Sequence, residues 1–302
     1  MATQSDAWPP LPVAEWADTY ATLHMWTQVV GKVRLALTPL TNHWWNVTLY
    51  LTARGLTTSP MPYRGRTIEI QFDFIDHTLA IEMSDGRRET IALQPQTVAS
   101  FYKKTLTTLA RLGVDVRIWP MPVEVPSPVR FDRDEQHASY DREYANRWWR
   151  VAASTATVMN EFRSRFLGKS SPVHFFWGSF DLAVTRFSGR RAPAREGADA
   201  MTREAYSHEV SSAGFWPGIP GKMDAAFYAY AAPEPAGFKT ARVAPSAAFY
   251  GAEFGEFFLK YDDVRMSSSP GDTLREFLQT TYEAAATLGE WNRAELERAV
   301  GV

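Results

Sequence analysis

Apolar and polar side chains alternate most regularly between residues 67 and 74. The apolar positions are Ile68, Ile70, Phe72 and Phe74, and the polar positions are Thr67, Glu69, Gln71 and Asp73. Successive side chains of a β-strand point to opposite faces, so this segment is predicted to be a strand with one buried and one solvated face. The segments 79–83 and 89–93 repeat the alternation after short turns, and together the three predict an antiparallel meander.

A helical spacing of apolar side chains flanks this meander on both sides. It predicts one helix over 15–30, ended by Gly31, and another over 97–112. Between the first helix and the meander, the residue types favour strands over 33–37 and 44–52, the latter because β-forming and aromatic residues are concentrated there.

The second half of the chain predicts the same succession of elements with longer loops. A helical pattern over 140–166 is followed by an aromatic-rich strand over 175–187, by candidate meander strands at 206–212, 226–231 and 256–259, and by a closing helix over 272–288. Aligned in one register, the halves match at Pro39 and Pro172, Trp44 and Trp177, Leu49 and Leu182, and Thr52 and Thr185. The two closing helices share five of thirteen positions without a gap.

These patterns predict an α+β fold of two pseudo-repeated halves, each an antiparallel sheet flanked by helices. The first repeat is expected over 13–120 and the second over 140–302, joined by a proline-rich and acidic linker over 121–139. The alternative is that aromatic strands and Leu-Gly helix ends match by chance. If the duplication is real, the seam between the halves is the expected place for a cleft.

The amino-acid composition excludes several classes of function. The chain has 302 residues, of which 45% are hydrophobic, 22% charged and 14% aromatic, and these include eleven Trp. A net charge of −2 offers no basic excess for phosphates, so nucleic acid is not an expected partner. The absence of cysteine excludes disulfides and thiolate chemistry. Without a long apolar run or a secretory signal pattern, a soluble cytoplasmic protein without membrane contact is expected.

The motifs of several enzyme classes are missing. The segment 167–170 resembles the end of a phosphate-binding loop, but its first glycine position is occupied by Arg163. No dinucleotide fingerprint, paired zinc histidines or nucleophile elbow occurs. Acid–base or hydrolytic chemistry is therefore favoured over redox chemistry.

The segment 172–186 holds the most distinctive group of polar residues. As a strand it places Ser179, Asp181, Ala183 and Thr185 on one face. Burial raises the pKa of a carboxyl group such as that of Asp181 unless a partner compensates. The functional interpretation is a pocket with Asp181 as a catalytic carboxylate, Trp177 as an apolar wall and Arg186 as an anion-binding residue. The structural interpretation is a solvent-facing Asp181, or an Asp181–Arg186 pair.

Histidines supply the remaining candidates. His43 and His174 each precede an aromatic strand, and at a seam they could converge as an acid–base pair or as metal ligands. His208 and Glu209 are further catalytic candidates, although neighbours on a strand point to opposite faces. Trp216 lies in a segment rich in glycine and proline that forms either a lid over a ligand or a plug over a sheet edge. Metal, cofactor and oligomeric state stay open.

Long segments of the chain resemble a bacterial family of uncharacterised proteins, domain of unknown function 5996. The resemblance is carried by Ser171-Pro-Val-His-Phe-Phe-Trp-Gly-Ser-Phe-Asp-Leu-Ala-Val-Thr-Arg-Phe-Ser-Gly189, by Tyr206-Ser-His-Glu-Val-Ser-Ser-Ala-Gly-Phe-Trp-Pro-Gly218 and by Asn42-His-Trp-Trp-Asn46. It extends from about Trp16 to Trp291 and implies a single full-length unit. It implies no reaction, substrate, cofactor or active site.

Three functions stay open at this point. The first is an enzyme that acts on a small molecule by acid–base or hydrolytic chemistry in a cleft between the halves, with His174, Asp181, His208 and Glu209 as catalytic residues and His43, Trp177, Arg186 and Trp216 as binding residues. The second is a non-catalytic protein that binds a small molecule or a peptide in an aromatic pocket. The third is a structural or interaction protein without a pocket.

Overall fold

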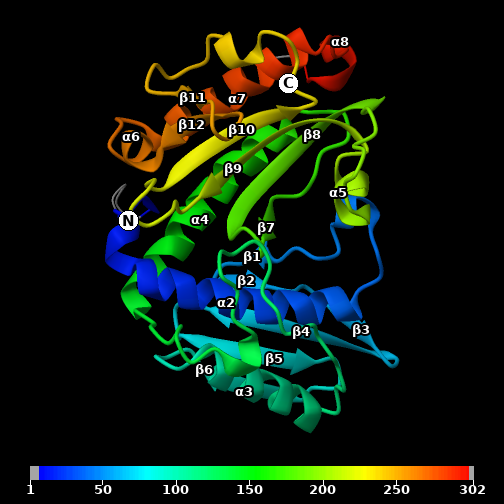
Figure 1. Cartoon of the computed structure of the whole chain (residues 1–302), viewed down its shortest axis with the longest axis vertical. Coiled ribbons are helices and arrows are strands. Elements are labelled where there is room, and N and C mark those ends of the chain that lie inside the picture. The colour runs from blue at the N-terminus through cyan, green and yellow to red at the C-terminus, as the bar shows by residue number, and fades with distance from the viewer. Residues whose placement is uncertain (1–6, 299–302) are drawn as a thin grey trace.

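The computed structural model describes residues 7–298 and has an α+β architecture with two antiparallel sheets of six strands each (Figure 1). The first sheet consists of β1 (Tyr50–Leu51), β2 (Gly55–Thr57), β3 (Met61–Tyr63), β4 (Arg66–Asp73), β5 (Thr78–Met83) and β6 (Arg88–Ala92). The second consists of β7 (His174–Phe176), β8 (Asp181–Arg191), β9 (His208–Trp216), β10 (Ala226–Ala232), β11 (Phe249–Gly251) and β12 (Glu256–Lys260). Helices in the described part are α2 (Val13–Leu37), α3 (Val98–Arg111), α4 (Arg142–Ser164), α5 (Ala200–Ala205), α6 (Tyr261–Arg265), α7 (Pro270–Leu288) and α8 (Arg293–Leu296), with 3-10 turns at Asn42–Trp44, Phe131–Arg133 and Phe238–Thr240.

Both predicted meanders are present. The strand order is β1-β2-β4-β5-β6 in the first sheet, with β3 also paired to β4, and β11-β12-β10-β9-β8-β7 in the second. Ile70 lies opposite Ile81, so that the apolar face predicted from the alternation is continuous across β4 and β5. The buried side chains of β4 are those of the apolar positions.

Each sheet has its own pair of long helices. α2 and α3 contact each other and the first sheet, whereas α4 and α7 contact each other and the second sheet. Thr97 caps α3 by accepting a hydrogen bond of 3.1 Å from the backbone N–H of Ser100. The order helix, meander, closing helix is therefore the same in both halves. No helix within residues 7–298 is long and apolar enough to span a membrane.

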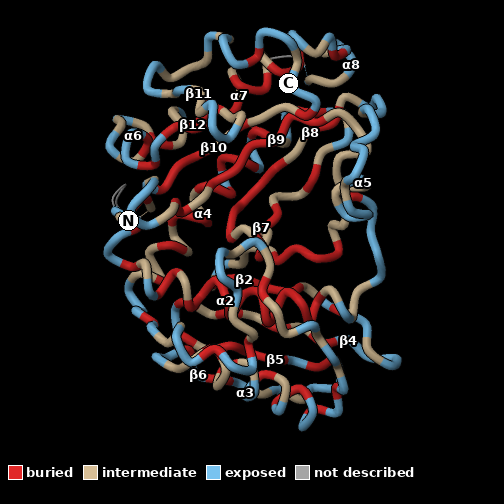
Figure 2. Tube along the Cα trace, viewed as in Figure 1, coloured by how far each residue is buried: buried red, intermediate tan, exposed pale blue. Residues whose placement is uncertain are grey.

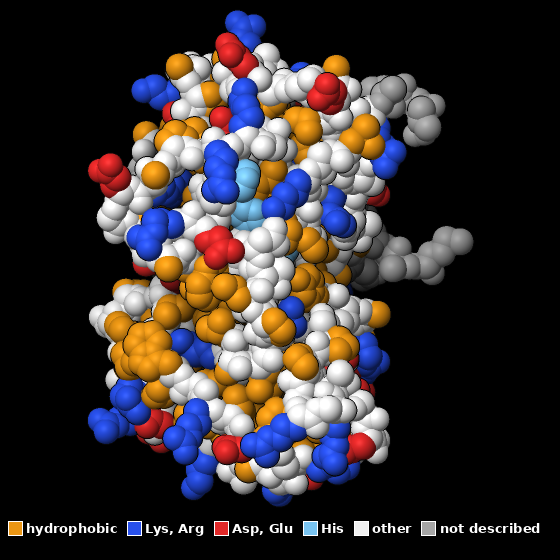
Figure 3. Space-filling view, turned by 90° about the vertical axis from the view of Figure 1, so that its right-hand side faces the viewer, with side chains coloured by type: hydrophobic (Ala, Val, Ile, Leu, Met, Phe, Trp, Pro, Cys, Tyr) orange, Lys and Arg blue, Asp and Glu red, His pale blue; other side chains and the backbone are white. Residues whose placement is uncertain are grey.

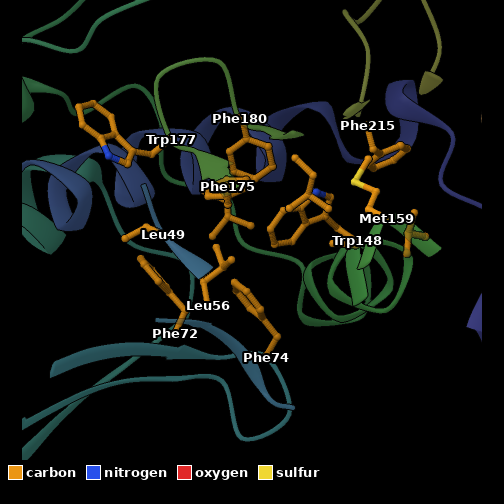
Figure 4. Close-up of a cluster of buried hydrophobic side chains, with 14 of the residues drawn as sticks. Leu49, Leu56, Phe72, Phe74, Trp148, Met159, Phe175, Trp177, Phe180 and Phe215 are labelled. Atoms are coloured by element: carbon orange, nitrogen blue, oxygen red, sulfur yellow. The ribbon is translucent and has the colours of Figure 1, made fainter. Parts of the chain in front are cut away.

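The two sheets meet at their first strands. Leu49, just before β1, and Phe175 in β7 exchange both backbone hydrogen bonds, at 3.0 and 2.9 Å. Trp148 of α4 packs on this junction and contacts Phe74 of the first half as well as Phe175 of the second (Figure 4). Buried residues run without a break through both sheets and α2 (Figure 2).

Three strand predictions were wrong. The single strand expected over 175–187 is two antiparallel strands, β7 and β8, separated by a turn at 177–180. Residues 33–37 continue α2, which does not end at Gly31. The glycine is explained by packing, because a side chain at position 31 would overlap the Trp177 ring. In the segment 44–52 only Tyr50–Leu51 is a strand. The backbone there breaks at His43 and Trp44, which have φ angles of 58° and 60° in the left-handed region.

The alignment of the two halves that paired Leu49 with Leu182 does not match equivalent strands of the two sheets. Leu49 precedes β1, whose counterpart as first strand of its sheet is β7, whereas Leu182 lies in β8. The domain boundaries stay a prediction, because one hydrophobic core contains residues of both halves. The last four residues of the expected second repeat, 299–302, lie outside the described part.

Candidate functional site

A cavity of about 600 Å³ lies at the seam between the two halves. Its walls come from α2, the segment after α2, the crossover between α3 and α4, the helix α5, and the strands β7 to β10 with the turn between β7 and β8. Six of its aromatic residues are Trp44, Trp45, Trp119, Phe176, Trp177 and Phe187. Figure 3 views the side of the molecule on which α5 lies, where hydrophobic side chains gather between the upper and lower halves.

The polar face predicted for the segment 172–186 forms one wall of this cavity. Asp181, Ala183 and Thr185 of β8 line it as the alternation indicated, and Ser179 lines it from the turn before β8 rather than from the strand. The Asp181 carboxylate is buried and accepts hydrogen bonds from the hydroxyls of Ser179 and Tyr228. Burial raises the pKa of Asp181, and the two hydroxyl donors act in the opposite direction because they stabilise the ionised form.

A second carboxylate enters the cavity from the crossover segment. Glu124 lines the cavity, and its carboxylate lies directly against Gly178, where any Cβ would overlap it. Gln28 of α2 anchors this segment: its side chain accepts from the N–H of Val123 at 2.9 Å and donates to the carbonyl of Val123 at 2.8 Å. The predicted linker is thus fixed to α2 and contributes to the site.

The carboxylates of the site influence one another. Burial raises the pKa of Glu124, and the charge of Asp181 raises it further. Burial and the charge of Asp181 also raise the pKa of Glu256 to about 7, although Glu256, at the start of β12, lies outside the cavity lining. Because like charges disfavour simultaneous ionisation, such a group binds a proton under conditions in which isolated carboxylates have lost theirs.

Unusual backbone conformations gather at the same place. His43, Trp44 and Glu124, with φ angles of 58°, 60° and 57°, all line the cavity. A positive φ is costly for a bulky side chain and persists only where the surrounding structure enforces it, and such residues cluster at functional sites.

Lys32 of α2 is the cation of this cavity. The residue is 5% exposed, and its ammonium lies 4.8 Å from the ring centroid of Trp119 and 5.6 Å from that of Trp177. Burial lowers the pKa of Lys32 to about 8. Trp177 is fixed because its indole N–H donates to the Val47 carbonyl at 2.6 Å.

His43 is held in one tautomer. The Lys169 ammonium donates to His43 Nε2 at 2.7 Å, so Nδ1 carries the proton and donates to the Glu204 carbonyl at 3.0 Å. Burial and the charge of Lys169 lower the pKa of His43. His43 is therefore a neutral imidazole in the cavity wall.

His174 and Arg186 lie outside the cavity lining. His174 is fully buried beside Trp45 and Phe176, and neither ring nitrogen has a partner within the described structure. Burial lowers its pKa to about 3. Arg186 is buried elsewhere, where it donates to the Phe162 carbonyl, and it forms no pair with Asp181.

The other three candidates also lie away from the cavity lining. The ring of His208 meets that of His43 edge-on, with centroids 5.7 Å apart, and accepts or donates a 3.0 Å bond with Ser207. Glu209 pairs with Arg190 at 2.7 Å. Trp216 ends β9, opposite Ala226, so it is part of the sheet and not of a loop. Of the eight candidates, the structure brings His43, Trp177 and Asp181 into one cavity.

No group of three or more His, Asp or Glu within residues 7–298 is arranged to hold a metal ion. Two more open hollows, beside α7 and between β6 and α3, are lined largely by exposed polar and charged side chains. The sequence interpretation missed Glu124, Lys32 and Tyr228. The one available signal was a lysine among the apolar residues Val29, Val30 and Val33 in the helical pattern of α2.

The comparison with protein families agrees with the resemblance seen in the sequence. No curated protein and no solved structure matches the chain. The model of a family of unknown function, DUF5996, matches residues 8–298, which is nearly the whole chain. The chain therefore belongs to this family of unknown function, DUF5996.

Proposed function

We propose that the protein is an enzyme that acts on a small molecule by acid–base or hydrolytic chemistry in the cavity between its two halves. The observation that carries this proposal is the entry of two carboxylates, Asp181 and Glu124, into one aromatic cavity. Pairs of titratable groups whose environments differ are typical of acid–base sites.

The two carboxylates have different surroundings, and this difference assigns their roles. Burial raises the pKa of Asp181, but this carboxylate also accepts two hydroxyl hydrogen bonds, which stabilise its ionised form, and we therefore assign it as the base of the pair. No hydrogen-bond donor from the described residues reaches the Glu124 carboxylate, which is raised in pKa by burial and by Asp181, so it is the acid. Proton transfer between the pair and a bound molecule needs both within hydrogen-bond reach of the reacting atoms.

The walls suit a substrate of moderate size. A volume of about 600 Å³ lies in the range of small-molecule sites, which are mostly apolar with a few placed polar groups. Aromatic walls exclude water and strengthen the electrostatic interactions of the carboxylates with a ligand.

A non-catalytic binding protein is the second candidate. The observation that favours it is the large share of aromatic side chains in the cavity wall, which supplies apolar contact without chemistry. The two functions differ in whether the ligand leaves unchanged.

Turnover in a bacterial metabolite extract distinguishes them. The purified protein is incubated with the extract, and mass spectrometry follows every compound over time. We expect at least one compound to be consumed by the wild type and by the exposed-site control Glu82→Gln, whose carboxylate pairs with Arg88 at 3.0 Å on the first sheet. Asp181→Asn should abolish this consumption while keeping the melting temperature of the wild type.

An extract in which no compound changes, or in which Asp181→Asn consumes the same compounds at the wild-type rate, would contradict the enzyme proposal. Native mass spectrometry on the same sample then tests the binding alternative, because an unchanged molecule retained by the wild type has an intact mass.

A further inference from the structure

Lys32 lacks the anion that a buried ammonium normally has. It is 5% exposed and lines the cavity, yet no carboxylate lies within ion-pair distance and no acceptor binds it among residues 7–298. Taking a charged group out of water without a partner is expensive. Contacts with the faces of Trp119 and Trp177 compensate only in part.

The surroundings hold this ammonium in place. Trp177 is fixed by its bond to the Val47 carbonyl and packs on Gly31, the residue next to Lys32. Lys32 also lies within the 25-residue helix α2, away from both of its ends. A preorganised and unpaired cation in the wall of an apolar cavity is a binding site for an anionic group.

We propose that Lys32 binds an acidic group of the substrate, so that the substrate is a small organic acid with a flat apolar body. The carboxylate is the simplest group that meets this description, and a phosphate shares its chemistry. The inference rests on the proposed function, since it assigns the substrate class of the same cavity.

The two kinds of charge enter the cavity from different elements. Lys32 comes from α2, Asp181 from β8 and Glu124 from the crossover, and Lys32 pairs with neither carboxylate. An organic acid therefore binds with its acidic group at Lys32, its flat body between the aromatic walls and its reacting atoms towards the carboxylate pair.

Matched probes test the charge without requiring turnover. Isothermal titration calorimetry compares 3-phenylpropionate with 3-phenylpropanamide, which has nearly the same shape and no charge, and with phenyl phosphate. We expect the wild type to bind an acid at least about tenfold more tightly than the amide. The more tightly bound of carboxylate and phosphate identifies the acidic group.

Variants then assign the preference to Lys32. Lys32→Met keeps the length of the side chain and should remove the preference, whereas Lys32→Arg should keep part of it. The control Lys222→Met changes an exposed lysine that pairs with Glu253 at 2.6 Å and should behave as the wild type. Circular dichroism melting checks that each variant is folded.

Equal affinity of the wild type for the acids and the amide, no binding of any probe, or an unchanged preference in folded Lys32→Met would overturn the inference. The outcome is independent of the enzyme proposal. If the wild type consumes extract compounds but does not prefer the acids to the amide, only the role of Lys32 is refuted. If the wild type prefers the acids but consumes no compound, only catalysis is refuted.

Discussion

The carboxylate of Glu124 lies against the backbone of Gly178, at a distance that leaves no space for a side chain at position 178. The crossover segment and the β7–β8 turn therefore meet in the cavity, and Glu124 owes its position to a glycine three residues before Asp181. Glu124 itself has a φ of 57°, a left-handed conformation that persists only where the surrounding structure enforces it.

Gly178→Ala should displace Glu124 without unfolding the protein. The overlap involves the far end of a flexible side chain, which can move away at little cost in stability. We expect the rate of consumption of an extract substrate to fall about tenfold or more, in line with the loss of one acid–base partner, with a melting temperature close to that of the wild type. Gly271→Ala, where a Cβ would meet Val158 at an ordinary 3.8 Å, is the control. A wild-type rate in Gly178→Ala would contradict the role of Glu124.

Gly31→Ala should destabilise the fold. Alanine in a helix gains up to about 1 kcal/mol over glycine. At position 31 the added methyl group would overlap the buried Trp177 ring, and overpacking of this kind costs about 1–3 kcal/mol. Because Trp177 is bonded to Val47 and cannot turn away, the steric term should prevail. Urea denaturation measures the difference, and a variant more stable than the wild type would show that Trp177 is free to move.

His174 should prove structural. It is fully buried with two unpartnered nitrogens, so His174→Leu should be as stable as the wild type or more so at pH 7, whereas His174→Ala should lose about 2–4 kcal/mol. In both variants, the folded fraction of the protein should consume extract compounds at the wild-type rate.

The same histidine makes stability depend on pH. Its pKa of about 3 in the folded protein lies below the ordinary 6.5, so the unfolded state binds the proton first. The contribution is complete above pH 6.5 and is lost towards pH 3, by about 1.4 kcal/mol per pH unit. His174→Leu should therefore reduce the slope of unfolding free energy against pH in this window. His24, whose pKa is lowered to about 4 by burial, keeps part of the slope. An unchanged slope would mean that His174 is not buried as described.

The affinity for organic acids should fall at alkaline pH. Lys32 has a pKa of about 8, so its ammonium loses its proton as the pH rises through this value, and a bound anion moves the midpoint upward. Glu124, Asp181 and His43 line the same cavity and titrate as well, so the comparison with Lys32→Arg isolates the lysine. Calorimetry from pH 6 to 10 should show a decline in the wild type that Lys32→Arg lacks. If the affinity declines with pH in the same way in the wild type and in Lys32→Arg, the decline belongs to a titratable group other than Lys32.

Much of the fold could be predicted because its signals are local. The alternation from Ile68 to Phe74 reports one buried face, and β4 has that face. The same argument placed Asp181 and Thr185 on one side of β8, where both line the cavity.

What the sequence did not reveal depends on contacts between distant segments. Gly31 has the features of a helix end, but α2 continues through it, and the glycine instead leaves space for the ring of the distant Trp177. Glu124 lies among prolines in a segment with the composition of a linker, and only its anchoring by Gln28 brings it into the site. The burial of His174 likewise depends on the junction of β1 and β7, which no local pattern reports.

The titration of the two cavity carboxyls tests the account most directly. Carbon-13 NMR of carboxyl-labelled Asp and Glu follows the wild type, Asp181→Asn and Glu124→Gln through the pH range. The account predicts that Asp181 and Glu124 titrate above the ordinary value of about 4, and that removal of either carboxylate lowers the pKa of the other. Two carboxyls that titrate near pH 4 and do not respond to each other's removal would contradict a coupled acid–base pair.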